Sequence, residues 1–369
     1  MVDYKLRNHI PLSGPATREP FIGDEPDLRI VLGFTPKWYH ERLGIDFSNI
    51  WHADPVYRYE SLIKMKTLLN NIFPQVADFK IDMENGIEKT CATISGVHGI
   101  MLIPLIYGIG AIYRKDGWPD AIPGQHMTKE MIKSLEPFDL MKNPVIEDLL
   151  AQMETIERNW NMIHGYLNYQ GILNIALKVR GNDIFTDMTD DPLFVHCFFE
   201  HIARTIKDVS ELIQARQRKS GFYVNLLSLS NCVMNMVSPQ MYEEFVLPYD
   251  RILSEERERF GIHTCNWNVT PYIEVLRKIK KVGYIDMGII SDMKRVKNVF
   301  PDARRAVLYS PVALEQKSME EIRLDMMKVY SELAPCDIIL ADIESTTSDI
   351  RINNFLSMID HILHQQNSY

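Results

Sequence analysis

From residue 222 onward, short apolar segments alternate with longer amphipathic segments along the chain. The apolar segments predict strands at 222–230, 261–265, 284–289, 305–311 and 337–344. The amphipathic segments predict helices at 238–261, 270–283, 292–301, 318–335 and 350–366, and a further helix precedes them at 190–221. Strands that alternate with helices at this spacing are typical of parallel βα units. Four or five consecutive units, with room for more upstream, favour an α/β fold of the (β/α)8 TIM-barrel type over an open sheet.

The length of 369 residues suits one such barrel with an N-terminal extension. Hydrophobic residues make up 46% of the chain and charged residues 24%, which is ordinary for a globular protein with a large core. Residues 1–60 are rich in proline and aromatic side chains. We therefore predict an ordered N-terminal extension over 1–60, packed on a barrel formed by residues 61–369.

Charge and cysteine usage exclude several classes of function. The net charge is −9 and there is no long run of lysine and arginine, so nucleic-acid binding is not expected. No apolar run reaches the roughly 18 residues of a membrane span, and the N-terminus lacks the apolar segment of a signal peptide. Five scattered cysteines, an odd number, argue against a disulfide framework and for a reducing compartment. We expect a cytoplasmic protein without a membrane partner.

A histidine and a cysteine close the predicted strand 261–265. Alternation along a strand points His263 and Cys265 to the same side. In parallel barrels the carboxyl ends of the strands carry the functional residues, so a metal held by this pair would lie in the barrel mouth. A His-x-Cys sequence alone is a weak signal, because many core strands contain one.

A catalytic zinc usually has three protein ligands and an open position, so a third ligand is needed. The ends of later strands offer Asp286, Asp342 and Glu344, and the last two, two residues apart, would share a face. Each carboxylate could equally be a helix cap or a solvated loop residue. Cys336 lies at the opposite end of its strand and is discounted.

Four segments carry a family resemblance: LGFTPKWY, GILNIALKVRGNDIFTDMTDDPLFVH, MVSPQMYEEFVLPY and IHTCNWN. Together they resemble the uroporphyrinogen decarboxylase superfamily, over about residues 29–362, and most of all its cobamide (corrinoid)-dependent methyltransferase branch. In that branch a His-x-Cys pair and a later cysteine bind zinc. The resemblance implies zinc ligands at His263 and Cys265, and it places Glu344 at the position of the later cysteine.

A His/Cys/Glu site is harder than a His/Cys/Cys site, because oxygen donates less electron density than sulfur. We therefore predict a zinc-dependent O-demethylating methyltransferase, with catalytic and metal-binding residues His263, Cys265 and Glu344. The small-molecule methyl donor would be a methyl ether. The resemblance implies that the methyl acceptor is Co(I) of a corrinoid (cobalamin) on a separate corrinoid protein, and that two copies of the chain could pair as a homodimer.

Further residues are expected around this metal. Asn231, Asn235, Trp267 and Tyr107 are candidates for substrate binding, although loop capping and ordinary packing are competing interpretations. Asp286 is expected to hydrogen-bond the imidazole of His263. Asp342 is expected near the metal, as a supporting residue or as the third ligand in place of Glu344.

Other functions stay open at this point. They are methyl transfer from methylcobamide to a thiol or a folate, a metal-independent decarboxylase, and a barrel that only binds a partner. True uroporphyrinogen decarboxylases resemble one another in an arginine-rich N-terminal segment that grips substrate carboxylates. Here that region offers Arg18 and Arg29 with acidic residues interleaved, which makes the decarboxylase the weaker alternative.

Overall fold

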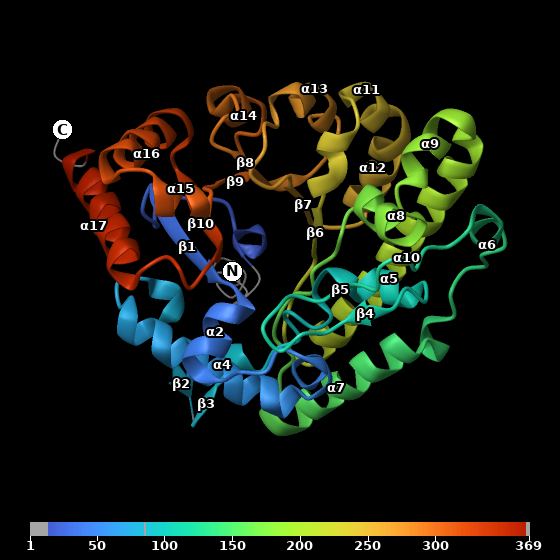
Figure 1. Ribbon diagram of the computed structural model, residues 1–369, viewed down its shortest axis with the longest axis horizontal. Coiled ribbons are helices and arrows are strands. Elements are labelled where there is room, and N and C mark those ends of the chain that lie inside the picture. Colours follow the sequence, from blue (N-terminus) through green and yellow to red (C-terminus); the bar gives the residue numbers. More distant parts are fainter. Residues whose placement is uncertain (1–13, 85, 367–369) are drawn as a thin grey trace.

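The computed structural model describes residues 14–84 and 86–366. Its centre is a parallel sheet of six strands in the order β1-β10-β9-β8-β7-β6, surrounded by helices (Figure 1). The strands are β1 (Leu28–Phe34), β6 (Leu226–Ser230), β7 (Arg259–His263), β8 (Val282–Gly288), β9 (Arg304–Leu308) and β10 (Cys336–Ile343). All five strands predicted from residue 222 onward are confirmed, although β6 starts four residues later than the predicted segment.

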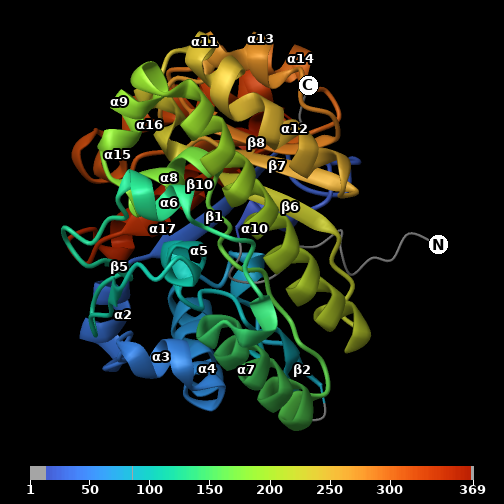
Figure 2. The ribbon, with the colours of Figure 1, turned by 90° about the vertical axis from the view of Figure 1, so that its right-hand side faces the viewer.

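Helices follow each of these strands along the chain. In the N-terminal half they are α2 (Pro36–Leu43), α3 (Asn49–Ala53), α4 (Pro55–Ile72), α5 (Leu102–Ile106), α6 (Lys129–Lys133), α7 (Pro144–Trp160), α8 (Ile172–Arg180) and α9 (Asp183–Asp190). In the C-terminal half they are α10 (Pro192–Lys219), α11 (Pro239–Met241), α12 (Leu247–Glu255), α13 (Ile273–Leu276), α14 (Met293–Val299), α15 (Pro311–Gln316), α16 (Met319–Leu333) and α17 (Asp349–Gln366). Figure 2 shows α12, α13 and α14 on the side of the molecule that carries β7 and β8.

Two short antiparallel pairs complete the secondary structure. They are β2 (Met83–Glu84) with β3 (Ile87–Glu88), and β4 (Ala111–Ile112) with β5 (Asp120–Ala121). None of the described helices is long and apolar enough to cross a bilayer.

The parallel order continues beyond β6 through single bridges. Gln170 bridges Ser230 of β6, and His164 bridges Thr93, both in the parallel sense. The segments around 164–170 and around 93 therefore occupy the places of two further barrel strands. Within the described part of the chain no pairing joins the segment around Thr93 to β1, so the fold is a six-stranded parallel α/β sheet whose barrel closure is not observed.

Part of the predicted extension over residues 1–60 belongs to the central sheet. Residues 28–34 form β1, which pairs with β10 along its whole length, from Leu28 opposite Cys336 to Phe34 opposite Ile343. The proline and aromatic content of this region therefore belongs partly to the central sheet. Residues 1–13 of the predicted extension lie outside the described residues.

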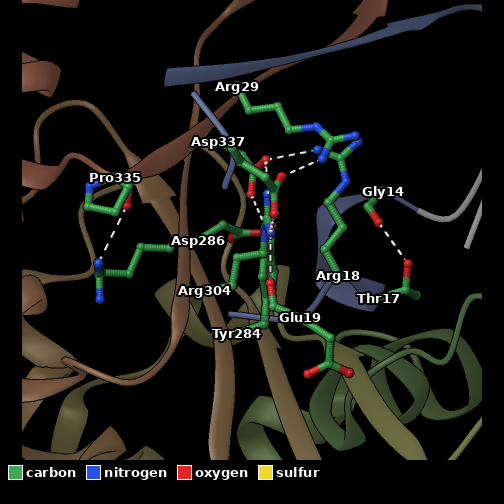
Figure 3. A network of polar contacts seen from close by, with 12 residues as sticks. Gly14, Thr17, Arg18, Glu19, Arg29, Tyr284, Asp286, Arg304, Pro335 and Asp337 are labelled. Carbon is green, nitrogen blue, oxygen red and sulfur yellow. Dashed lines mark hydrogen bonds and ion pairs between the residues drawn. The ribbon is translucent and has the colours of Figure 1, made fainter. Parts of the chain in front are cut away.

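Residues just before β1 close the amino ends of the strands. Arg18 donates to Asp337 at 3.0 Å, and Arg304 donates to the same carboxylate at 2.6 and 2.9 Å (Figure 3). Arg304 also pairs with Glu25 at 3.0 Å, and Arg29 with Asp78 at 2.7 Å. We call these six residues the N-terminal ion network. Because Arg18, Arg304 and Asp337 are fully buried, the network holds the N-terminal segment against the sheet.

The two faces of the sheet are buried differently. Tyr284, Ala306 and Ile339 form a small apolar cluster on the inner face, packed against Ala16 and Val31. Their neighbours along the strands, such as Ile285, Val307 and Ile338, belong to the main hydrophobic core beneath the helices. This alternation is what a parallel sheet buried on both faces requires.

Two predicted helices differ in the structure. The segment predicted as a helix over 270–283 is helical only to Leu276. Its last two residues, Val282 and Gly283, already belong to β8. The proline interruption predicted at Pro248 takes the form of a π-helical turn, η7 (Tyr242–Val246), directly before α12. Pro248 lacks the N–H that an α-helix needs at this point, and a wider turn accommodates the loss.

Candidate metal centre

Three potential metal ligands meet at the carboxyl ends of two neighbouring strands. His263 is the last residue of β7, Cys265 follows it by two residues, and Cys232 starts the 3-10 helix η6 (Cys232–Met236) directly after β6. One ligand atom of each lies within 4.8 Å of the others, and all three side chains are partly exposed. Tetrahedral zinc with Zn–S and Zn–N bonds of about 2.0–2.3 Å holds its ligand atoms about 3.5–4 Å apart. The spacing therefore fits such an ion with little movement.

Asp286 fixes the orientation of the His263 ring. The ring Nδ1 lies 2.5 Å from Oδ2 of Asp286, a fully buried carboxylate on β8. This is the hydrogen bond that the sequence analysis predicted. It leaves Nε2 as the ring nitrogen available to a metal, which is the arrangement that supports many zinc histidines.

The Asp286 carboxylate accepts two more hydrogen bonds. Tyr284 Oη donates to Oδ2 at 2.8 Å, and the backbone N–H of Thr264 donates to Oδ1 at 2.6 Å. The Thr264 hydroxyl in turn donates to the Asp286 carbonyl oxygen at 2.6 Å. Residues 263 and 264 are therefore tied to β8 through one side chain.

Cys265 lies beyond the end of β7 in a left-handed conformation, with φ of 70°. Such a conformation costs a residue other than glycine on the order of 1 kcal/mol or more, and is concentrated at functional sites. The following loop lies over Gly288, whose N–H donates to the Trp267 carbonyl at 2.9 Å. A Cβ atom at position 288 would lie 2.0 Å from the Asn266 carbonyl oxygen, so the loop after Cys265 requires a glycine there.

The three groups shift one another's proton affinity. A hydrogen bond from the Cys232 thiol, together with His263, lowers the pKa of Cys265 to about 4. The Cys265 sulfur beside Cys232, with burial, raises the pKa of the Cys232 thiol. Burial alone would lower the pKa of His263, but the Asp286 carboxylate raises it well above its ordinary value. The pKa shifts therefore favour the charged form of Cys265 and the neutral form of Cys232.

The donor set fits zinc. Two sulfur atoms and one imidazole nitrogen are soft-to-intermediate ligands of the kind that Zn²⁺ binds. Cys232, His263 and Cys265 supply these three ligand atoms. A fourth tetrahedral position would be left for a substrate atom.

The third predicted ligand, Glu344, is not part of this group. Its side chain is exposed, and Oε2 accepts a hydrogen bond from the Thr35 hydroxyl at 3.3 Å. Asp342 accepts a hydrogen bond from Trp118 Nε1 at 3.0 Å. Asp342 has φ of 57°, and the β1–β10 register shifts beside it. Simple strand alternation, on which a shared face for Asp342 and Glu344 depended, does not hold through this irregularity.

Among the predicted substrate-binding residues, Asn231 and Tyr107 are engaged elsewhere. Asn231 is buried, and its side-chain amide donates to Asp250 at 3.4 Å. Tyr107 packs in the helix layer, where its hydroxyl lies 2.7 Å from His201 Nδ1 on α10. Their side chains are thus used in packing and not presented at the metal centre.

Asn235 and Trp267 lie in the loops that carry the ligands. Asn235 is exposed on η6, three residues after Cys232. Trp267 is partly buried, stands two residues after Cys265, and packs edge-on against Tyr272 at a centroid distance of 5.4 Å. Both therefore remain candidates for contacting a bound substrate.

Cys232 is the residue that sequence reasoning missed. The search for a third ligand considered only strands after β7, whereas Cys232 follows the strand before it. The same rule that located His263, namely a metal-binding side chain at the carboxyl end of a strand, applies to Cys232 after the strand that ends at Ser230. Extending that rule in both directions along the chain would have found it.

Comparisons with known proteins identify the fold and no more. No family model matches the chain, and no curated protein sequence matches it. Among solved structures, a methyltransferase from Methanosarcina mazei has a TM-score of 0.64 at 12% identity, over 92% of this chain and 95% of that one. A B12-independent methionine synthase from Shewanella sp. W3-18-1 aligns over 93% of this chain and 99% of that one, at 11% identity and a TM-score of 0.45. At such low identity the first likeness defines a shared fold, and the second is too distant to carry an argument.

Proposed function

We propose that this protein is a zinc-dependent methyltransferase in which Cys232, His263 and Cys265 hold the metal and a small thiol is the methyl acceptor. The observation that carries the proposal is the pair of cysteine sulfurs beside one oriented imidazole at the carboxyl ends of β6 and β7. The fold shared with a methyltransferase and the sequence resemblance to the corrinoid-dependent branch support methyl transfer as the reaction.

A thiol substrate suits this ligand set better than an ether. Two thiolate ligands donate more electron density than a thiolate and a carboxylate, so they leave the ion a weaker acid toward oxygen and compatible with a third sulfur. The ether interpretation depended on Glu344 as a ligand, and Glu344 hydrogen-bonds Thr35 instead. The preference therefore moves from O-demethylation to the thiol alternative.

The chain's own residues prepare the site for this reaction. A zinc ion held here would supply Lewis acidity that lowers the proton affinity of the acceptor thiol. Asp286 keeps the Nδ1 proton on His263 and so presents Nε2. The loop over Gly288 sets the position of Cys265, and the partly exposed cluster leaves room for the acceptor from the outer side.

The methyl donor in this proposal is a methylcorrinoid carried on a separate protein. The Co–C bond breaks as the C–S bond forms, cobalt leaves as Co(I), and the thiol proton has passed to solvent. In-line attack requires donor and acceptor to meet over the strand ends, where a partner can dock. The corrinoid partner rests on the sequence resemblance.

The test combines metal analysis with a spectroscopic assay. Purified protein should contain about one zinc per chain, and it should convert methyl-Co(III) to Co(I) in the presence of a panel of small thiols. The same protein given Co(I) and a panel of methyl ethers should form little methyl-Co(III). Turnover with ethers and not with thiols would refute the choice of acceptor, and full activity in metal-free protein would refute the metal centre.

In the decarboxylase alternative, arginines of the N-terminal region would bind the carboxylates of the substrate. Arg18 and Arg29 belong to the N-terminal ion network, at the amino ends of the strands, where each pairs with a carboxylate. The metal cluster lies at the carboxyl ends. These two arginines are therefore not placed to bind the carboxylates of a substrate at the metal centre.

A further inference from the structure

We propose that Tyr242, Asp250 and Asn231 form a buried positioning chain that holds Cys232 in place for the metal. The inference rests on the metal centre proposed above and adds three residues that do not touch the metal or the substrate. They act through the short loop between β6 and η6.

The positioning chain is a series of contiguous hydrogen bonds in the protein interior. The Tyr242 hydroxyl donates to Oδ2 of Asp250, and the Asn231 amide donates to the same oxygen at 3.4 Å. Tyr242 and Asp250 are fully buried and Asn231 is 3% exposed. Asn231 directly precedes Cys232, so the last link of the chain adjoins a ligand.

Asn231 connects both ligand-bearing segments. Its backbone N–H donates to the carbonyl oxygen of His263 at 2.8 Å, which ties the start of η6 to the end of β7. Asparagine at the start of a helix usually caps it with its side chain, yet Asn231 makes no such cap. Its amide is turned toward Asp250 instead, so the side chain belongs to the positioning chain and does not cap the helix.

The π-helical turn explains how Tyr242 reaches Asp250. Eight residues along an α-helix, at about 100° each, leave two side chains about 80° apart around the axis. The turn η7 covers Tyr242–Val246 and rotates less per residue, which brings the two side chains toward the same side. Wide turns of this kind are frequent at functional sites, and this one aims a tyrosine at the loop that carries Cys232.

A buried carboxyl group in this place is costly for folding. Among the residues that the structure describes, none hydrogen-bonds Oδ1 of Asp250, and burial raises the pKa of the group to about 7. An apolar residue of similar size would pack without that cost, since replacing buried polar groups by well-packed apolar ones is often neutral or stabilising. The acceptor at position 250 is therefore better explained by what it holds in place than by stability.

Other contacts hold η6 on both sides of Cys232, and the one before it is the backbone hydrogen bond from Asn231 to His263. The Val233 N–H donates to Asn174 Oδ1 at 3.0 Å, and the Tyr272 hydroxyl donates to the Met234 carbonyl at 3.1 Å. Both anchors lie after Cys232. Loss of the Asn231 side-chain anchor leaves the residue before Cys232 held through its backbone and no longer through its side chain, so the Cys232 end of η6 should loosen while the remainder stays in place.

The experiment uses the full chain loaded with cobalt(II) in place of zinc, because the thiolate-to-cobalt absorption increases with the number of bound cysteines. Asp250→Val and Tyr242→Phe should each lower that absorption to about half, as one of two thiolates leaves, and Cys232 should become open to alkylation while Cys265 stays protected. Asp250→Asn keeps an acceptor oxygen and should retain the wild-type spectrum. Tyr309→Phe, which removes another buried tyrosine–aspartate hydrogen bond (Tyr309 to Asp325, 2.6 Å), is the matched control and should also retain it.

Wild-type absorption and continued protection of Cys232 in folded Asp250→Val and Tyr242→Phe would overturn the positioning chain. If Asp250→Val does not fold, Tyr242→Phe decides, because it removes only a hydroxyl. Failure of the wild-type protein to bind cobalt would instead refute the metal centre itself, so the two failures are distinguishable.

Discussion

The strongest test of the metal centre is the substitution Asp286→Asn. The carboxylate accepts hydrogen bonds from His263, Tyr284 and Thr264 at 2.5, 2.8 and 2.6 Å. An asparagine oxygen can keep the first two, but its NH2 group then faces the Thr264 N–H, and the negative charge opposite His263 is lost. Such supporting groups typically contribute 10- to 100-fold to metal affinity, so we expect zinc to bind about 1.4–2.7 kcal/mol more weakly.

Competition with a coloured zinc chelator measures this affinity directly. Asp325→Asn is the matched control, because Asp325 also accepts from a tyrosine hydroxyl, that of Tyr309, but lies on α16. Denaturant unfolding of both metal-free variants separates a loss of fold from a loss of affinity. Zinc affinity within twofold of wild type in a folded Asp286→Asn protein would refute the role assigned to Asp286.

Three further outcomes follow from the structure. Cys232→Ser should lower the thiolate-to-cobalt absorption to about half whereas Glu344→Gln leaves it unchanged; unchanged absorption in Cys232→Ser together with weakened cobalt binding in Glu344→Gln would restore Glu344 as the third ligand. Burial raises the pKa of Asp250 from 3.8 to about 7, so the folded state favours the protonated carboxyl group. The stability that comes from this proton binding is fully present below about pH 4 and is lost as the pH rises through about 7. Relative to Asp250→Asn, the wild-type free energy of unfolding should therefore fall by up to about 4 kcal/mol over that range; parallel pH profiles in denaturant titrations would contradict this. Arg304→Met removes one of the two arginines that pair with the buried carboxylate of Asp337, leaving Arg18, and should lower the free energy of unfolding by roughly 1–3 kcal/mol, while zinc affinity in the folded protein stays unchanged.

The sequence predicted the elements that depend on local pattern. Short apolar segments between amphipathic ones located β6 to β10, and the rule of carboxyl strand ends placed His263 and Cys265 together. The Asp286–His263 hydrogen bond was also predictable, because β8 follows β7 and neighbouring parallel strands present equivalent positions side by side.

What the sequence did not predict depends on irregular backbone. The register shift between β1 and β10 and the positive φ of Asp342 break the alternation on which the position of Glu344 was based. Cys232 lies in the 3-10 turn directly after β6, so it is marked by the rule of carboxyl strand ends and not by a periodic pattern. The contact between Tyr242 and Asp250 needs a π-helical turn, which periodicity at 3.6 residues does not reveal.

The metal ligands and the two carboxylates predicted beside them lie on different parts of the sheet. The three ligands and Asp286 come from the consecutive strands β6, β7 and β8 or from the loops directly after them, whereas Glu344 and Asp342 follow or end β10, two strands away from β8. Strands β8 and β9 therefore separate the ligands on β6 and β7 from a carboxylate at the end of β10. Glu344 and Asp342 hydrogen-bond Thr35 and Trp118 instead, so the two cysteines and the histidine define the centre without them.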